Sequence, residues 1–197
     1  MDQKKELVFT HARPEEAEEI MKVVLDAYIV EVGTTGIAFK TKNRYLSIDQ
    51  VHEDIKKSIE NGPDDKPEQV YFVARYSNDL SSPIVGCIRG VFLHDPKDGA
   101  FVCEAGPIAV DPKYQGQGLG SLIINHVEKY AVNERGVQFI QLTVVNWRTD
   151  VIPFYHKRGF VDVGEKPFRQ PGHSLEDSCL SRESHFIIMR KPAVLKE

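Results

Sequence analysis

The chain has 197 residues, and 41% of them are hydrophobic. At roughly 150 residues per domain this length predicts a single domain over residues 1–197, large enough to bury a core without disulfides or metals. The 25 Lys and Arg and the 29 Asp and Glu give a formal net charge of −4. This composition excludes a mainly disordered chain and gives no bulk attraction to nucleic acid or to an anionic membrane, so we expect neither as a partner.

Cysteine usage and the N-terminal residues predict an intracellular protein. The cysteines, Cys87, Cys103 and Cys179, are odd in number and too few for a disulfide framework in a chain of this length. No apolar run approaches the ~18 residues of a membrane span, and residues 1–6 lack the apolar region of a signal peptide. We therefore expect a cytoplasmic location, with the nucleus as the alternative, and either a monomer or a homodimer.

The first third of the chain predicts one strand followed by two helices. Residues 7–11 form a short strand, and Pro14 suits the first turn of a helix that is predicted to end at Gly33. Ser47 and Gln50 form a capping-box signal for a second helix, which ends near residues 61–62. The residues between the two helices, 34–46, are predicted to form a loop.

The middle of the chain predicts three strands followed by a central helix. The β-rich runs 69–76, 84–92 and 100–110 are separated by turn residues and predict an antiparallel meander. A helix then begins at the glycine-rich residues 116–120 and ends at Gly136. Its apolar side chains recur at helical spacing, and the predicted buried face consists of Leu119, Leu122, Ile123, Val127, Tyr130 and Ala131.

The last third predicts strands at residues 137–145, 160–164 and 185–189, with a short helix over 153–158. The polar segment 166–184 is longer than most loops. The complete order, β-α-α-β-β-β-α-β-α-β-β, predicts an α+β fold with a mixed β-sheet flanked by helices. We expect the sheet to be mostly antiparallel, with one parallel pair connected through the central helix.

The most informative segment joins the third β-rich run to the central helix. Gly116, Gly118 and Gly120 lie between a strand end and a helix N-terminus, where several free main-chain amides meet the positive end of the helix dipole. This arrangement favours binding of a phosphate group, and the absence of Cβ atoms allows close approach to the backbone. The alternative is a tight strand-to-helix connection without a ligand.

Two other phosphate-binding motifs can be tested on the same residues. A P-loop requires Lys and then Ser or Thr after its last glycine, but Ser121 and Leu122 follow Gly120. A dinucleotide-binding fingerprint requires the strand to lead directly into the glycines, but residues 111–114 intervene. The sequence therefore excludes the first motif and disfavours the second.

This segment resembles the signature of the GNAT superfamily of acyl-CoA-dependent N-acetyltransferases, Gln/Arg-x-x-Gly-x-Gly/Ala. Gln115, Gly118 and Gly120 match that signature. A second block also matches, because Asn146 is followed by Phe-Tyr-x-x-x-Gly-Phe at residues 154–160. The interval between Asn146 and this block is longer than is common in the family, whereas the spacing within the block is kept.

The resemblance implies that acetyl-CoA is the cosubstrate, bound between two parallel strands that splay apart, and that no metal takes part. The pyrophosphate of acetyl-CoA would lie on the glycine-rich loop, and its pantetheine would lie along the preceding strand. The cofactor-binding residues implied in this way are Ile108, Ala109, Val110, Gln115, Gly116, Gln117, Gly118, Leu119, Gly120, Ser121 and Asn146. The main-chain amide of Ile108, or of a neighbour at a bulge beside Pro107, could polarise the thioester carbonyl.

Acyl transfer to an amine requires two proton transfers that side chains can assist. Alkylamines, with a pKa of about 10, are mostly protonated at neutral pH, so a base must accept a proton before attack. Glu104 is the candidate base, because histone-acetylating members of the family have a base glutamate at the same interval of eleven residues before Gln115. The alternative is a solvated strand glutamate without a catalytic role.

Tyr155 is the candidate acid, because a phenol can donate a proton to the departing thiolate of CoA. The resemblance assigns this role to the tyrosine of the second block. The alternative is an aromatic residue that only packs beside Phe154 and Phe160.

These observations predict an enzyme that transfers an acetyl group from acetyl-CoA to a primary amine by direct attack in a ternary complex. A small-molecule amine or a polyamine is the favoured acceptor, and the mild acidity of the chain is equally compatible with lysine side chains and protein N-termini. One alternative is a protein or peptide acetyltransferase that acts on lysine side chains or N-termini, and another is a non-catalytic module that binds acyl-CoA. Residues 34–46 and 166–184 are expected to form the acceptor side.

Overall fold

A seven-stranded mixed sheet forms the centre of the part of the chain that the computed structural model describes, residues 7–35, 48–60, 66–146, 148–167 and 185–194. The strands are β1 (Val8–His11), β2 (Gln69–Arg75), β3 (Gly86–His94), β4 (Phe101–Val110), β5 (Phe139–Val145), β6 (Val161–Pro167) and β7 (His185–Pro192). Their order in the sheet is β1-β2-β3-β4-β5-β7-β6, and β4 and β5 form the parallel pair among antiparallel neighbours. The predicted α+β class and mixed sheet are confirmed.

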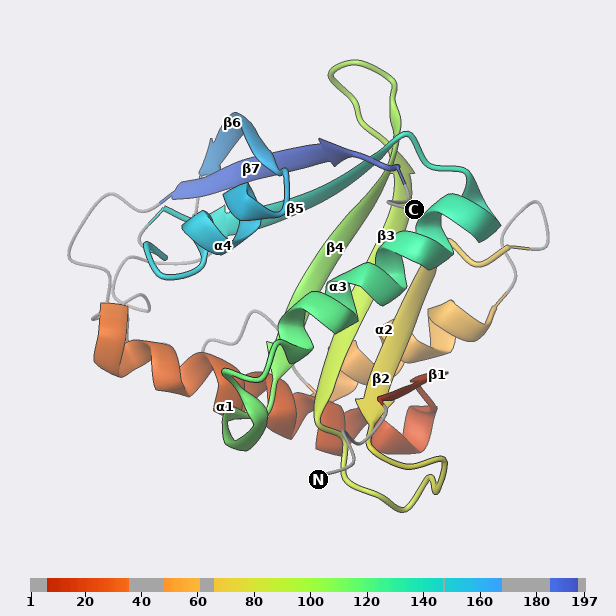
Figure 1. Cartoon of the computed structure of the whole chain (residues 1–197). Helices are drawn as coiled ribbons and strands as arrows, with labels where there is room; N and C mark the ends of the chain where they lie inside the picture. Colours follow the sequence, from red (N-terminus) through yellow and green to blue (C-terminus); the bar gives the residue numbers. More distant parts are fainter. Residues whose placement is uncertain (1–6, 36–47, 61–65, 147, 168–184, 195–197) are drawn as a thin grey trace.

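Four α-helices accompany the sheet in the described residues: α1 (Ala17–Thr35), α2 (Ile48–Ile59), α3 (Leu119–Tyr130) and α4 (Ile152–Lys157). Helices α1 and α2 pack on one face of β2, β3 and β4, and α3 packs on the other face (Figure 1). Helix α3 connects the parallel strands β4 and β5, as the order of elements predicted. None of the helices in these ranges is long and apolar enough to cross a membrane.

The start of α1 follows the sequence closely, but its end does not. Pro14 opens a 3-10 turn that leads into the helix, and Glu16 closes the turn by accepting a hydrogen bond from the main-chain N–H of Arg13 at 2.7 Å. The helix continues past Gly33 to Thr35, because a single glycine costs a helix only about 1 kcal/mol and does not by itself end it. Ser47 and the predicted loop 36–46 lie outside the described residues.

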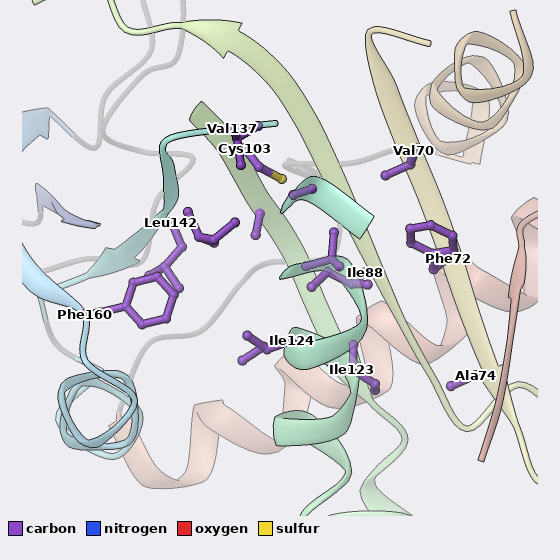
Figure 2. Close-up of a cluster of buried hydrophobic side chains, with 14 of the residues drawn as sticks. Val70, Phe72, Ala74, Ile88, Cys103, Ile123, Ile124, Val137, Leu142 and Phe160 are labelled. Carbon is purple, nitrogen blue, oxygen red and sulfur yellow. The ribbon is translucent and has the colours of Figure 1, made fainter. Parts of the chain in front are cut away.

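The larger core cluster lies between α3 and the sheet. Figure 2 shows Ile123 and Ile124 of α3 among side chains from the strands, with Phe72 on one side and Leu142 and Phe160 on the other. Close packing requires a small residue at Gly90 of β3, where a Cβ would lie 3.0 Å from both Cys103 Sγ and Val127 Cγ2. The central helix therefore covers the part of the sheet around the parallel pair.

The predicted buried face of α3 differs from the structure at Leu122 and Ile124. Leu122 is 46% exposed, whereas Ile124, which the prediction omitted, is 1% exposed. Each residue of an α-helix turns about 100° further around the axis, so the arc centred on Ile123 and Val127 includes Ile124 and leaves Leu122 on the opposite side. The sheet determines which arc is buried, and the sequence alone cannot choose between two overlapping arcs.

Candidate active site

The parallel strands β4 and β5 are paired only at their N-terminal ends. Val102 lies opposite Phe139, and Glu104 lies opposite Gln141 at the last paired position. Beyond that point β4 continues to Val110 while β5 diverges from it (Figure 1). The main-chain groups of β4 beyond Glu104 therefore have no ladder partner on the β5 side and are available to other groups. We call this divergence the splay.

A β-bulge lies on β4 immediately beyond the splay's origin. Gly106 and Pro107 both stand opposite Arg89 of β3, so β4 has one extra residue there. The flanking pairs are Gly90 with Ala105 and Ile88 with Ile108. The bulge that the sequence predicted beside Pro107 is confirmed, and it precedes the amide of Ile108, the predicted donor to the thioester carbonyl.

An ion pair anchors this bulge to α2. Arg89 Nε donates a hydrogen bond to the carbonyl oxygen of Gly106 at 3.1 Å, and the same guanidinium pairs with the carboxylate of Asp54 on α2. Asp54 is buried and also accepts a hydrogen bond from Gln50 Nε2 at 3.0 Å. Because a buried carboxylate is costly without such partners, the contacts hold α2, β3 and the bulge together.

The connection from β4 to α3 is folded back on the strand end by side-chain hydrogen bonds. Asp111 Oδ1 accepts a hydrogen bond from the N–H of Lys113 at 2.9 Å, which caps a short 3-10 turn. Gln115 Nε2 then donates to the carbonyl oxygen of Val110 at 3.0 Å. Gln115, which the family signature contains, thus fixes the glycine-rich loop beside the end of β4.

The glycine-rich loop presents free amides at the start of α3. Gly116 and Gly118 have φ values of 75° and 79°, in the region that glycine adopts without strain. Within the described chain, the N–H groups of residues 116–120 donate no backbone hydrogen bond, and a Cβ at Gly116, Gly118 or Gly120 would meet nothing within 4 Å. Amides without a backbone acceptor at the N-terminus of a twelve-residue helix fit a phosphate group.

The side chains of the predicted cofactor-binding residues divide between core and surface. Ile108 and Val110 pack against the core on the α3 side, whereas Ala109 is buried in the core under α1 and α2. Leu119 is buried as well, while Gln117 is exposed and Ser121 is half-buried. At Ala109 and Leu119, therefore, only main-chain groups are available to a ligand.

Glu104 lies at the origin of the splay on the face opposite α3. Its neighbour Cys103 faces α3, so strand alternation directs the Glu104 side chain to the other side of the sheet. The carboxylate is 34% exposed, and its Oε1 lies 3.8 Å from Lys166 Nζ of β6. Burial raises the pKa of the Cys103 thiol to about 12, so this residue is a packing group and not a nucleophile.

Tyr155 lies on α4, on the same side of the sheet as α3. Its ring packs against the core, with its centroid 5.3 Å from that of Phe154 and 5.8 Å from that of Phe160. The guanidinium of Arg158 joins α4 to α3 through the side chain of Asn125. Glu104 and Tyr155 therefore lie on opposite faces of the sheet, in which β4 and β5 diverge beyond Glu104.

Asn146 ends the ladder between β5 and β7. Its main-chain N–H donates to the carbonyl oxygen of His185 at 3.0 Å, and its Oδ1 accepts from the N–H of His185 at 3.2 Å. The side-chain oxygen is thus engaged with β7. Binding of acetyl-CoA by Asn146 stays a prediction.

The roles of Arg89, Asp54 and Lys166 do not follow from the sequence pattern. Arg89 could have been noticed as a lone charge within an apolar strand, although its partner on a distant helix could not. The sequence predicts a loop at Lys166, but β6 extends to Pro167 and aligns this lysine with Phe186 of β7.

Residues 168–184, the rest of the predicted acceptor segment, lie outside the described residues. In the described part of the chain no group of three His, Cys, Asp or Glu side chains could hold a metal ion.

Comparison with solved structures supports the assignment of the fold. An acetyltransferase of the GNAT family from Streptococcus pneumoniae aligns with a TM-score of 0.61 and 20% identity, covering 95% of this chain and 99% of the other. Spermidine N-acetyltransferase from Vibrio cholerae, in complex with CoA and spermine, aligns with a TM-score of 0.63 and 18% identity over 95% of each chain.

The ribosomal-protein-S18-alanine N-acetyltransferase from Escherichia coli has a TM-score of 0.61 and 16% identity, with 98% of this chain and 97% of the other covered. No curated protein matches the sequence significantly. The model of the acetyltransferase (GNAT) family matches residues 38–160, well over half of the chain and including the splay, the glycine-rich loop and α4. This match, together with the mixed sheet and its single parallel pair, shows that the chain belongs to the GNAT family of acetyltransferases.

Proposed function

We propose that this protein transfers an acetyl group from acetyl-CoA to a primary amine by direct attack in a ternary complex, and that small amines and polyamines are its favoured acceptors. The observation that carries the proposal is the free-amide loop at the start of α3 directly beyond a strand whose carboxylate, Glu104, lies at the splay. Acetyl-CoA supplies the acetyl group as a thioester.

The main chain of the loop would bind the diphosphate of CoA. Five consecutive N–H groups, those of residues 116–120, have no backbone acceptor in the described chain, and the loop glycines leave open space beside them. Amides held by the fold need no reorganisation on binding, and the dipole of α3 adds favourable charge. Gln115 would act indirectly, because its side chain fixes the loop against Val110.

The bulge would place a hydrogen-bond donor at the reacting carbonyl. Pro107 has no N–H, so the first free donor after the bulge is the amide of Ile108 or a neighbour. Such a donor stabilises the negative charge that develops on the carbonyl oxygen during attack. Arg89, which holds the carbonyl of Gly106, would fix the direction of this amide.

Glu104 and Tyr155 would move the two protons. Glu104 accepts a proton from the acceptor's ammonium group, which frees the nitrogen lone pair for attack. A C–N bond then forms and the C–S bond breaks, and Tyr155 donates its phenolic proton to the departing sulfur. The nitrogen of the new amide loses its excess proton to solvent, from which Tyr155 is reprotonated. Their positions on opposite faces of the sheet are consistent with an amine that arrives from one side and a thiol that leaves on the other.

Charge and structural likeness both bear on the acceptor. The net charge of −4 and the half-exposed Glu104 favour a cationic acceptor, and one structural neighbour is a spermidine N-acetyltransferase. A second candidate function is acetylation of protein N-termini or lysine side chains, and the likeness to a ribosomal-protein N-acetyltransferase favours it.

Release of free thiol from acetyl-CoA in the presence of propylamine, spermidine, amino acids and lysine-containing peptides tests the proposal. We expect turnover with propylamine and spermidine. Turnover with peptides alone would establish the second candidate. Binding of CoA without thiol release for any acceptor would identify a non-catalytic acyl-CoA-binding module and contradict both.

A further inference from the structure

The ammonium group of Lys166 lies between a carboxylate and an aromatic ring. Its Nζ is 3.8 Å from Glu104 Oε1 and 5.7 Å from the centroid of the Phe186 ring. The three residues come from β4, β6 and β7, and the register of the β6–β7 hairpin pairs Lys166 with Phe186. The strands therefore fix the positions of the carboxylate and the ring, and the long side chain of Lys166 reaches both.

The nearby arginines have other partners. Arg190 of β7 is held by Asp95 and Asp98, and Arg89 of β3 is held by Asp54. Among the described residues, Lys166 supplies the cation that pairs with Glu104. The negative charge at the splay is thus neutralised by a side chain that is itself a primary alkylamine.

A carboxylate combined with an aromatic face is a chemical environment that binds alkylammonium ions. At 3.8 Å the contact between Lys166 and Glu104 is an ion pair that is longer than a charge-assisted hydrogen bond, and the two side chains are 44% and 34% exposed. Pairs of this kind are weak, because water screens them and a flexible chain must be ordered. Another ammonium group can therefore displace Lys166.

We propose that Glu104 and Phe186 form the subsite for the acceptor's ammonium group, and that Lys166 occupies this subsite until an acceptor replaces it. The inference rests on the proposed function, since it takes Glu104 as the base. The lysine side chain also indicates the substrate class: an unbranched, terminal alkylammonium group, without a neighbouring carboxylate that Glu104 would repel. Polyamines and simple alkylamines have this chemistry, whereas free α-amino acids do not at their α-amino group.

Occupation by Lys166 lowers the apparent affinity for the acceptor in proportion to the fraction of protein in which the subsite is free. From the usual strength of half-exposed ion pairs, removal of the lysine tightens acceptor binding by about two- to sixfold. Substitution by arginine keeps a cation in place, so its effect is smaller. Loss of the Phe186 ring weakens acceptor binding by about two- to fivefold.

The experiment compares Lys166→Met, Lys166→Arg, Phe186→Leu and a matched control, Lys129→Met, which removes an exposed lysine from α3. Calorimetric titration of the full chain, saturated with CoA, measures the dissociation constant of spermidine and of propylamine at constant ionic strength. We expect tighter binding in Lys166→Met, weaker binding in Phe186→Leu, and no change in Lys129→Met. In turnover assays the KM for the amine falls in Lys166→Met while the KM for acetyl-CoA stays constant.

A double-mutant cycle tests the link between Lys166 and Glu104. In a Glu104→Gln background, Lys166→Met leaves the affinity for spermidine unchanged, because the lysine no longer competes for a carboxylate. Unchanged or weaker amine binding in Lys166→Met alone would overturn the inference. Because calorimetry requires no turnover, a protein that binds CoA and amine in the expected pattern but transfers no acetyl group would contradict only the proposed function.

Discussion

Glu104 combines two properties that a base for an ammonium substrate needs: it lies at the origin of the splay, and it is open to solvent in part. We expect Glu104→Gln to reduce kcat/KM most strongly at low pH, where nearly all of the amine is protonated and a base has the largest effect. Near the pKa of the amine, at about pH 10, the loss of kcat/KM in Glu104→Gln becomes smaller, because neutral amine is then abundant.

A pH profile of kcat/KM for spermidine measures this difference, with Glu165→Gln as the matched control. Glu165 lies on β6 next to Lys166, but its carboxylate is exposed and pairs with His185. The control should follow the parent profile. Parallel profiles for Glu104→Gln and the parent protein would remove Glu104 from the role of base.

Substitution of Tyr155 tests the second proton transfer, to the departing thiolate of CoA. We expect Tyr155→Phe to lower kcat by about 100-fold or more, the usual contribution of a general acid, while the dissociation constant of acetyl-CoA stays near its parent value. The ring still packs against Phe154 and Phe160, so the fold should be retained. Tyr130→Phe, which removes a hydroxyl from the far end of α3, is the control, and equal rates in the two variants would show that Tyr155 only packs.

At the scale of elements, the ion pair between Arg89 and Asp54 joins α2 to the bulge of β4. Arg89→Met leaves the buried Asp54 carboxylate without its guanidinium partner, and we expect it to lower the free energy of unfolding by about 2–4 kcal/mol. This loss of stability is smaller than that for a fully buried pair, because Arg89 is 25% exposed. Lys22→Met, which breaks an exposed pair on α1, should leave the free energy of unfolding close to that of the parent protein, because water screens this pair.

Urea denaturation of both variants measures the two values. A similar small loss in each would show that the contact between α2 and the bulge contributes little to stability. A change confined to Arg89→Met would show that the fold is stabilised by the contact between Asp54 and Arg89, which lie 35 residues apart, and no local sequence pattern contains that contact.

Local patterns were sufficient to predict most elements. The three β-rich runs became β2, β3 and β4. Gly136, in the left-handed region, ends the π-helical turn Ala131–Arg135 that continues α3, because turn chemistry and periodicity act over few residues. The glycine-rich loop was also predicted, as its chemistry depends on consecutive residues. The pairing of Glu104 with Lys166, and of Arg89 with Asp54, depends on sheet register and helix docking between distant segments. Those contacts required the structure.

For the whole molecule, acetyl-CoA binding and folding are linked, because a ligand that binds only the native state stabilises it. At a CoA concentration 100 times the dissociation constant, the free energy of unfolding rises by about 2.7 kcal/mol. For a domain of this length, that gain raises the melting temperature by about 5–10 °C. A thermal melt followed by circular dichroism, with and without CoA, measures the shift.

Gly118→Glu should abolish this shift, since it places a carboxylate where the diphosphate would bind and a side chain at a φ of 79°. The substitution also strains the backbone, so the melting temperature without ligand falls and only the CoA-induced difference is informative. Gly99→Glu is the matched control: its φ is 71°, its Cβ site is equally open, and it lies at the opposite end of β4. Because both variants carry the same strain and the same new charge, loss of the shift in Gly118→Glu alone assigns the diphosphate to the start of α3. An equal shift in both variants would contradict that assignment, and with it the role of the glycine-rich loop in the proposed reaction.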